Sequence, residues 1–241
     1  MSACYLSVVI PAYNEERRLP ETLDTVCAYL ATQAYPWEIV VADDGSDDAT
    51  AVIVARAGQK DERVKLLPLP HRGKGWAVKN GMLAARGEYR FLCDADLSMP
   101  IDLLERLLPN GAPSPDIVIG SREALGARRI GEPRRRWLMG RIFNAMTRAL
   151  ATPGIADTQC GFKVFRAAAA ETLFGLQTLD GFAFDAEILF LARRRGFSVA
   201  EVGIDWHYRP ESKVRPIRDG WRTLRDLIII RYRSLAGRYQ R

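Results

Sequence analysis

Short apolar runs, separated by segments with helical spacing, divide the first half of the chain. Five runs have the length and bulk of buried strands, at residues 6–10, 37–42, 64–67, 89–93 and 116–120. The segments between them predict helices over residues 20–32, from Ser46 or Asp48 to about 57, up to 85, and over 101–108. Strands that alternate with helices in this way predict a mostly parallel sheet with right-handed crossovers, flanked by helices.

The second half of the chain is less regular. Its apolar spacing predicts helices over residues 133–151, 182–195 and 219–233, and one strand over residues 199–206. We find no linker, internal repeat or low-complexity tract. We therefore expect one α/β domain with a first half at residues 1–125 and a second half at residues 126–241, which carries a C-terminal layer of amphipathic helices.

Two aspartates, Asp94 and Asp96, follow the fourth predicted strand. Because residues i and i+2 of an extended chain point the same way, both carboxylates can face one point in space. Hard oxygen ligands suit Mg²⁺ or Mn²⁺, and Mg²⁺ typically takes one or two carboxylates together with substrate phosphates. An isolated Asp-x-Asp is short and common, so a surface turn with two solvated acids is the alternative.

Polar clusters follow nearly every predicted strand of the first half. They are Tyr13, Asn14 and Glu15, then Asp43 and Asp44, then Lys74, Asp94 with Asp96, and Arg122. The carboxyl ends of parallel strands share one edge of the sheet, and ligands bind at that edge in open α/β sheets. The repeated placement favours a metal-assisted ligand site over a solvated turn.

Charge and cysteine content narrow the partners and the compartment. The net charge is +6, with an excess of arginine, which favours an anionic partner: a phosphorylated substrate, a membrane surface or nucleic acid. The four cysteines lack metal-ligand spacing and are typical of a reducing compartment. The N-terminus lacks the pattern of a signal peptide, and no run approaches the roughly 20 apolar residues of a spanning helix. We expect a protein that is soluble or lies on a membrane surface.

The predicted helix over residues 133–151 has an apolar face beside a basic stripe. The apolar face holds Leu138, Ile142, Ala145 and Ala149, and the stripe near Trp137 holds Arg134, Arg141 and Arg148. Such a helix can lie in a membrane interface. A core helix with a solvated basic edge fits the same pattern and is slightly favoured by the helical wheel alone. The final predicted helix is again basic and amphipathic.

Motifs along almost the whole chain resemble family 2 glycosyltransferases of the GT-A fold. They are residues 8–15, Asp43 to Thr50, Gly73-Lys74-Gly75, Asp94-Ala-Asp96, Gly120-Ser-Arg122, Asp157 to Lys163, Phe184-Asp185-x-Glu187 and Ser212-Lys213. Each motif is weak alone, but their order is specific. It is similar to the branch that loads sugars onto polyprenyl or dolichyl phosphate, and residues 157–163 are most similar to its glucosyl members.

The resemblance implies a role for each motif. The residues implied to bind the nucleotide-sugar are Pro11, Tyr13, Glu15, Asp43, Asp44, Lys74 and Asp94. Asp94 and Asp96 are implied to bind the metal, Mn²⁺ or Mg²⁺. The residues implied to bind the acceptor phosphate are Arg122, Ser212 and Lys213. The implied catalytic residues are Asp96, Arg122, Gln159, Asp185 and Glu187. Ser98 stands where many mannosyl relatives carry glutamine, so a third protein ligand to the metal is not implied.

The implied reaction is an inverting, metal-dependent transfer of a sugar to a polyprenyl or dolichyl phosphate. The expected sugar is glucose, and the expected donor is UDP-glucose. A phosphate acceptor is mostly ionised near neutral pH, since its second pKa is about 6, so it needs charge neutralisation rather than a strong base. We expect the nucleotide-sugar in the first half, the acceptor in the second, and a peripheral position on the cytoplasmic face of an anionic membrane.

Several alternatives remain open from the sequence. GDP-mannose can replace UDP-glucose as the donor. A phosphoaspartyl hydrolase also carries Asp-x-Asp, but on its first strand, and a nucleotidyltransferase expects a Gly-rich basic loop after that strand. A non-catalytic, membrane-associated binding protein is a further alternative. No nucleic-acid recognition motif is visible, so we expect no nucleic-acid partner.

Overall fold

A seven-stranded sheet runs through the protein, and its strands come from both halves of the chain. The computed structural model describes residues 4–109, 114–208 and 216–239. The strands of the main sheet are β1 (Leu6–Ala12), β2 (Trp37–Asp43), β3 (Val64–Pro68), β4 (Tyr89–Cys93), β5 (Ile117–Ser121), β7 (Phe162–Arg166) and β8 (Val199–Gly203). Their order is β3-β2-β1-β4-β7-β5-β8, and a separate two-stranded sheet pairs β6 (Arg128–Ile130) with β9 (Asp205–His207).

All strands of the main sheet except β7 run in one direction. The pairs β1–β2, β1–β4, β2–β3 and β5–β8 are parallel, whereas β7 is antiparallel to both β4 and β5. The prediction of a mostly parallel sheet is therefore confirmed. Because β7 is reversed, its first residue, Phe162, lies opposite Cys93, the last residue of β4. The segment before β7 thus reaches the edge where the parallel strands end.

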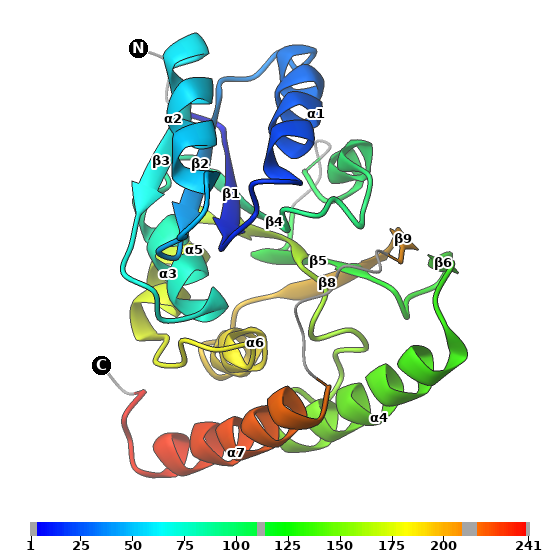
Figure 1. The fold of residues 1–241 in the computed structure, drawn as a ribbon. Helices are drawn as coiled ribbons and strands as arrows, with labels where there is room; N and C mark the ends of the chain where they lie inside the picture. Colours follow the sequence, from blue (N-terminus) through cyan, green and yellow to red (C-terminus); the bar gives the residue numbers. More distant parts are fainter. Residues whose placement is uncertain (1–3, 110–113, 209–215, 240–241) are drawn as a thin grey trace.

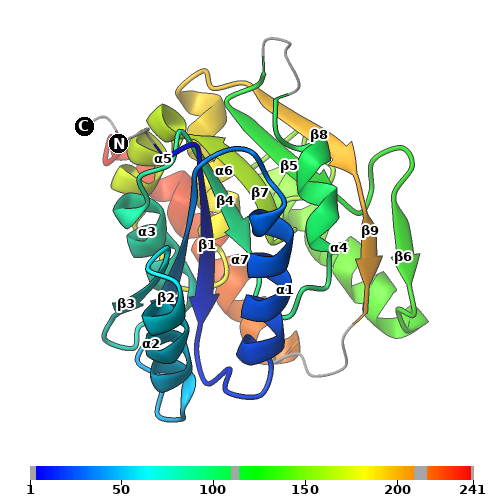
Figure 2. The ribbon, with the colours of Figure 1, turned by 90° about the horizontal axis from the view of Figure 1, so that it is seen from above.

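Helices cover both faces of the sheet (Figure 1). They are α1 (Leu19–Ala31), α2 (Thr50–Lys60), α3 (Lys74–Ala84), α4 (Arg134–Leu150), α5 (Ala167–Leu176), α6 (Phe184–Arg194) and α7 (Pro216–Leu235), with a 3₁₀-helix η1 at Ile101–Arg106. The helices α1 and α2 lie on one face, and α3, α5 and α6 lie on the other, as the view from above also shows (Figure 2). Figure 1 shows α4 and α7 side by side as a further layer below α6.

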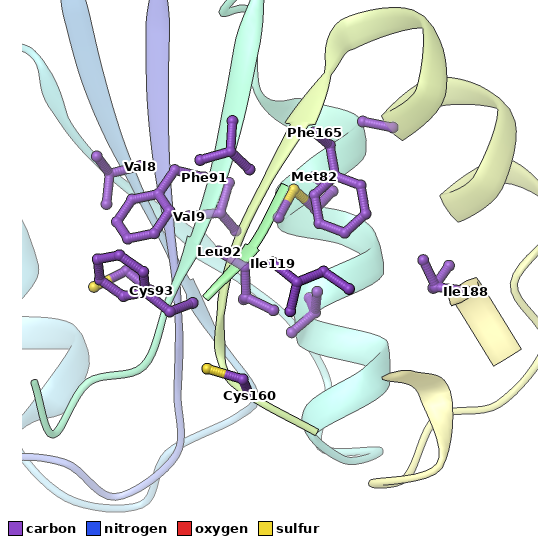
Figure 3. Packing of buried hydrophobic residues seen from close by; sticks show 14 of the residues in the cluster. Val8, Val9, Met82, Phe91, Leu92, Cys93, Ile119, Cys160, Phe165 and Ile188 are labelled. Atoms are coloured by element: carbon purple, nitrogen blue, oxygen red, sulfur yellow. The ribbon is translucent and has the colours of Figure 1, made fainter. Parts of the chain in front are cut away.

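The continuous apolar runs predicted as strands are buried because helices cover both faces of the sheet. Every residue of β1, β2, β4 and β5 is buried, as is usual for parallel strands covered on both sides. Figure 3 shows side chains of β1, β4, β5 and β7 gathered with Met82 of α3 and Ile188 of α6. Phe91 and Phe162 meet edge to face at 4.6 Å between ring centroids, which fixes β7 against β4 next to the site.

The structure differs from the prediction in several elements, and the strands β6 and β7 are among those that were not predicted. The helix α5 was not predicted, because Ala167–Leu176 is mainly apolar and its N-terminus has no side-chain cap. The single strand predicted over residues 199–206 is two strands, β8 and β9, in different sheets. The helix predicted over residues 101–108 is the shorter 3₁₀-helix η1.

Leu138, Ala145 and Ala149 of the predicted apolar face of α4 are exposed to solvent. Leu138 is 54% exposed and Trp137 is 41% exposed, and the neighbouring Arg134, Arg141 and Arg148 are exposed as well. The core-helix interpretation of this segment is therefore wrong for the residues described. The helix α7 also exposes large apolar side chains, at Trp221, Ile228, Tyr232 and Leu235. In the described part of the chain, no helix has the length and apolar character that crossing a membrane requires.

We predict that Glu38→Gln lowers stability through a buried charge network. Glu38 is 3% exposed and accepts hydrogen bonds from the Ser7 hydroxyl, Lys65 Nζ and the Arg86 backbone N–H at 2.6–2.7 Å. Burial alone would raise the pKa of Glu38, but these bonds lower it to about 2. Loss of the charge should cost about 1–3 kcal/mol in the free energy of unfolding at pH 7.

The same change should alter the pH dependence of stability. A depressed carboxyl pKa stabilises the folded state above the unfolded value of about 4.3, and this contribution is lost as pH falls toward the folded value. The stability gap between wild type and Glu38→Gln should therefore narrow below about pH 4.3. Urea unfolding at several pH values measures the gap, with the exposed Glu62→Gln as the matched control. If the stability difference between wild type and Glu38→Gln does not change with pH, the charged network around Glu38 does not stabilise the fold as predicted.

Candidate active site

Lys74 and Asp94 form an ion pair at the edge where the parallel strands end. Asp94 follows β4, Lys74 begins α3, and Lys74 Nζ lies 2.7 Å from Asp94 Oδ1. Burial lowers the pKa of Lys74, but the Asp94 and Asp185 carboxylates outweigh burial and raise it above its ordinary value. Both side chains keep about a quarter of their surface exposed, at 28% and 25%. The pair is charged and open to a ligand.

Gly161, just before β7, makes the room for the Asp94 carboxylate. A Cβ atom at position 161 would lie 1.9 Å from Asp94 Oδ2, well inside van der Waals contact. The second aspartate is also held, since Asp96 Oδ1 accepts the Ser98 backbone N–H at 2.9 Å. A side chain at position 161 would therefore displace the Asp94 carboxylate from the position it holds.

The acid pair fits a hard divalent cation. Its donors are the carboxylate oxygens of Asp94 and Asp96. Because residue 161 is glycine, no side chain lies against the Asp94 carboxylate at that position. Across the described ranges, no cluster of three or more His, Cys, Asp or Glu side chains is arranged to hold a metal. A cation here would complete its coordination with substrate oxygens and water, as Mg²⁺ commonly does.

Asp43 and Asp44 hold loops in place beside the site. Asp44 is 2% exposed, and its carboxylate accepts the backbone N–H groups of Arg72 and Gly73, each at 2.9 Å. Asp44 Oδ2 also lies 2.8 Å from His71 Nδ1. Asp43 accepts the Ser46 backbone N–H at 3.2 Å and the Ser46 hydroxyl. Asp44 therefore fixes the loop that delivers Lys74.

His71 is a site residue that the sequence did not indicate. Its ring stacks on Tyr13, with 4.1 Å between centroids and 20° between planes, although its side chain is 53% exposed. The contact joins the loop after β1 to the loop before α3. Gly73 in that loop has φ +131°, a conformation that favours glycine, and a Cβ there would lie 2.6 Å from the Asp180 carbonyl oxygen. A lone histidine in a loop gave no sequence signal for this stack.

Glu15 and Asp96 line two cavities on this side of the protein. Glu15 is 9% exposed and binds Arg18 through two hydrogen bonds of 2.7 Å. It lines a cavity of about 460 Å³ together with Asn14 and Asp48. Asp96 lines a second cavity of about 550 Å³, to which Arg18 and His207 also contribute. Pro11 is buried within β1.

Arg122 is held by a buried carboxylate. Asp157 is 1% exposed and accepts Arg122 Nε at 2.7 Å, Arg122 Nη2 at 2.8 Å and the Arg122 backbone N–H at 2.9 Å. Burial raises the pKa of Asp157, but the Arg122 guanidinium outweighs burial and lowers it to about 2. Glu201 fixes the segment in turn by accepting the backbone N–H groups of Ala156 and Asp157. A guanidinium carries five N–H donors, so Arg122 can bind Asp157 and a phosphate oxygen together.

The remaining predicted catalytic residues have different surroundings. Asp185 lies in the first turn of α6, and its Oδ1 atom accepts a hydrogen bond from the buried Lys163 Nζ at 2.5 Å. Glu187 is 0% exposed and accepts the Thr178 and Leu179 N–H groups and the Tyr239 hydroxyl, at 3.0, 2.9 and 2.6 Å. Glu187 thus secures a loop and the C-terminal segment, and its catalytic role stays a prediction.

The structure says less about three other residues predicted for the site, Gln159, Ser212 and Lys213. Gln159 is half-buried, and its backbone N–H donates to Asp157 Oδ1 at 3.3 Å. Ser212 and Lys213, predicted to bind the acceptor phosphate, lie outside the described residues. Their role stays a prediction.

Comparison with known proteins identifies related chains. Residues 7–174 match the family described as Glycosyl transferase family 2. A dolichyl-phosphate beta-glucosyltransferase of Dictyostelium discoideum is 36% identical, and the alignment covers 97% of this chain and 76% of the relative. The Homo sapiens and Saccharomyces cerevisiae proteins of that name are 35% and 33% identical, each over 98% of this chain and 77% of their own.

Solved structures share the fold. Glucosyl-3-phosphoglycerate synthase from Mycobacterium tuberculosis, in complex with UDP, has a TM-score of 0.66 and 21% identity, over 98% of this chain and 80% of its own. Mannosyl-3-phosphoglycerate synthase from Rubrobacter xylanophilus has a TM-score of 0.67 and 19% identity, over 99% and 76%. These likenesses confirm the predicted GT-A architecture.

We predict that Gly161→Ala abolishes activity without unfolding the protein. The added methyl group would displace the Asp94 carboxylate, which lies 1.9 Å from the position of the new Cβ. Donor binding and turnover measure the effect, and circular dichroism checks the fold. Gly175→Ala is the matched control, because a Cβ at that position meets nothing within 4 Å. A fully active Gly161→Ala enzyme would show that the position of Asp94 does not matter.

Proposed function

The chain belongs to glycosyl transferase family 2 and is a glycosyltransferase, and from this premise we propose that it transfers glucose from UDP-glucose to a dolichyl or polyprenyl phosphate, with inversion at the anomeric carbon. The observation that carries the proposal is the likeness to dolichyl-phosphate beta-glucosyltransferases over 97–98% of the chain. Family membership removes the hydrolase, nucleotidyltransferase and non-catalytic alternatives. GDP-mannose remains the alternative donor.

The leaving group dictates the chemistry at the acid pair. A nucleoside diphosphate gains negative charge as its bond to the sugar breaks, and Asp94 and Asp96 would hold the Mn²⁺ or Mg²⁺ ion that offsets this charge when bound. Lys74 Nζ lies 2.7 Å from Asp94 Oδ1 and would add a second positive charge there. The M. tuberculosis synthase of the same fold has been crystallised with Mn²⁺ and UDP, so Mn²⁺ is the first ion to test.

We assign the base and ribose to the loops after β1 and β2. Pro11, Tyr13 and Glu15 would line the nucleotide end, and Asp43 and Asp44 would shape it through the loops that they hold. The stacked Tyr13 and His71 rings offer an aromatic surface beside it. Residues 1–125 would thus form the donor half of the domain.

The acceptor would enter from residues 126–241. Arg122, fixed by Asp157, suits bidentate recognition of phosphate, and Ser212 and Lys213 would complete that site. Gln159, next to the same carboxylate, would lie near the sugar. The phosphate oxygen then attacks the anomeric carbon directly, because the acceptor is already ionised near neutral pH.

A lipid acceptor requires a membrane contact, and α4 and α7 would provide it. Both helices expose large apolar side chains, and α4 adds three exposed arginines. Amphipathic helices of this kind bind anionic surfaces from one side. We propose a peripheral position on the cytoplasmic face of a membrane, with no nucleic-acid partner.

The donor and acceptor assignment predicts a clear preference in a direct assay. With Mn²⁺ and a short-chain prenyl phosphate, UDP-glucose should be used at least about tenfold faster than GDP-mannose, a difference of about 1.4 kcal/mol in transition-state free energy. Chelation with EDTA should abolish the transfer. Faster transfer from GDP-mannose would show that UDP-glucose is not the preferred donor. Transfer to a soluble sugar in preference to the prenyl phosphate would show that the acceptor class is wrong.

The membrane assignment predicts salt-sensitive binding to anionic liposomes. Each basic residue near such a surface contributes about 1 kcal/mol, so R134E/R141E/R148E should bind far more weakly than wild type. The matched control R17E/R56E/K60E changes three exposed charges around α1 and α2, on the other side of the protein, and should bind like wild type. Sedimentation measures binding. Equal binding of wild type and both variants would show that α4 does not contribute to membrane binding.

A further inference from the structure

Lys163 is a lysine buried in the middle of the main sheet. It lies on β7 opposite Leu92 of β4 and Ile119 of β5, and its side chain is 1% exposed. Its Nζ donates hydrogen bonds to Asp185 Oδ1 and to the Cys160 carbonyl oxygen, both at 2.5 Å. A buried ammonium group is costly unless it is paired, so both contacts are needed in this position. Lys163 is not among the residues proposed to bind the donor, the metal or the acceptor.

The charges of Lys74 and Asp94 act on the partner carboxylate, Asp185. Asp185 is 7% exposed in the first turn of α6. The charged groups that act on it are Lys163 from β7, Lys74 from α3 and Asp94 after β4. Since Lys74 also binds Asp94, four charges of alternating sign lead from the centre of the sheet to the acid pair.

Lys163 opposes the tendency of Asp185 to take a proton. Burial raises the pKa of Asp185 above its ordinary value, and the two lysines act in the opposite direction. Protonation of Asp185 would weaken its bond to Lys163 and leave an ammonium without a counter-charge in the interior, which is strongly unfavourable. The pKa of Asp185 is raised on balance, but a proton on this carboxylate would weaken the 2.5 Å contact between its Oδ1 atom and the Lys163 ammonium, so the ion pair opposes proton uptake by Asp185.

Neighbouring carboxylates are engaged in similar ways. Asp44 accepts two backbone N–H groups, Asp157 binds Arg122, and Glu187 accepts bonds from residues 178, 179 and 239. A general base must be able to receive the proton that it removes. The oxygens of these three acids already accept hydrogen bonds from other groups of the protein.

We propose that Lys163 is a specificity-determining residue, which by pairing with Asp185 withholds a general base from the site and restricts the acceptor to groups that are already ionised, such as phosphate monoesters. The inference rests on the proposed function and names the reason for its acceptor class. When a phosphate dianion attacks, its oxygen bonds to the anomeric carbon and the nucleoside diphosphate leaves with the bonding electron pair. No proton moves. When water or an alcohol attacks, the O–H proton must pass to a base, and Asp185 in the ion pair does not serve.

The test compares two reactions of one donor. Purified wild type, K163Q, K163M, K163R and K163M/D185N are given UDP-glucose and Mn²⁺, with and without a short-chain prenyl phosphate. Transfer to the phosphate and release of glucose into water are measured, and circular dichroism checks each fold. Glutamine keeps a hydrogen-bond donor for Asp185 and the Cys160 carbonyl, so K163Q is the variant expected to fold if K163M does not.

The expected result is a change in the ratio of the two rates. In K163Q or K163M, hydrolysis relative to phosphate transfer should rise about tenfold or more, since general-base catalysis is worth about 10²–10⁴-fold. K163R should keep the low wild-type ratio, and K163M/D185N should return to it because the carboxylate is gone. If both rates fall equally in K163Q and K163M, Lys163 is structural and the inference is overturned.

The inference and the proposed function fail in different ways. If wild type does not use the prenyl phosphate, the acceptor class is wrong. Hydrolysis still tests the ion pair in that case, because K163Q should hydrolyse the donor about tenfold faster than wild type. An unchanged hydrolysis rate would overturn the inference alone.

Discussion

The approach of Gly161 to the Asp94 carboxylate is the constraint on which the rest of the site depends. It arises because β7 runs against its neighbours, so its first residues reach the edge where β4 ends. Asp94 then faces Lys74, whose loop is held by Asp44. A side chain at position 161 would break this sequence of contacts at its centre.

Several acids at this edge stabilise the backbone rather than face a ligand. Asp44, Asp157 and Glu187 are each at most 2% exposed and accept backbone N–H groups from loops around the site. A buried carboxylate that accepts several hydrogen bonds is rigid, and it fixes the groups that donate to it. The resemblance to a family marks such residues as functional, and the contacts indicate that they act through the geometry of Lys74 and Arg122.

The strands β1 to β5 and the edge of the site could be predicted from the sequence, because parallel strands buried on both faces are continuous apolar runs, whereas the antiparallel strand β7 and the short strand β6 were not predicted. The acid pair and Lys74 were placed correctly at that edge. The helix α5 was missed because the alanine run Ala167–Ala170 has neither a polar face nor a cap. The pairing of β6 with β9, the Tyr13–His71 stack and the Lys163–Asp185 pair join residues 22 to 77 positions apart, which spacing does not reveal.

Calorimetric titration of UDP-glucose into wild type and Asp96→Ala, with and without Mn²⁺, tests the central claim most directly, namely that the acid pair binds the donor diphosphate through a cation. The account predicts that Mn²⁺ tightens donor binding by wild type and has no such effect on the folded Asp96→Ala variant. Asp102 is an exposed acid that lines the same cavity as Asp96, and Asp102→Ala should behave like wild type. Equal tightening by Mn²⁺ in wild type and Asp96→Ala would contradict the account.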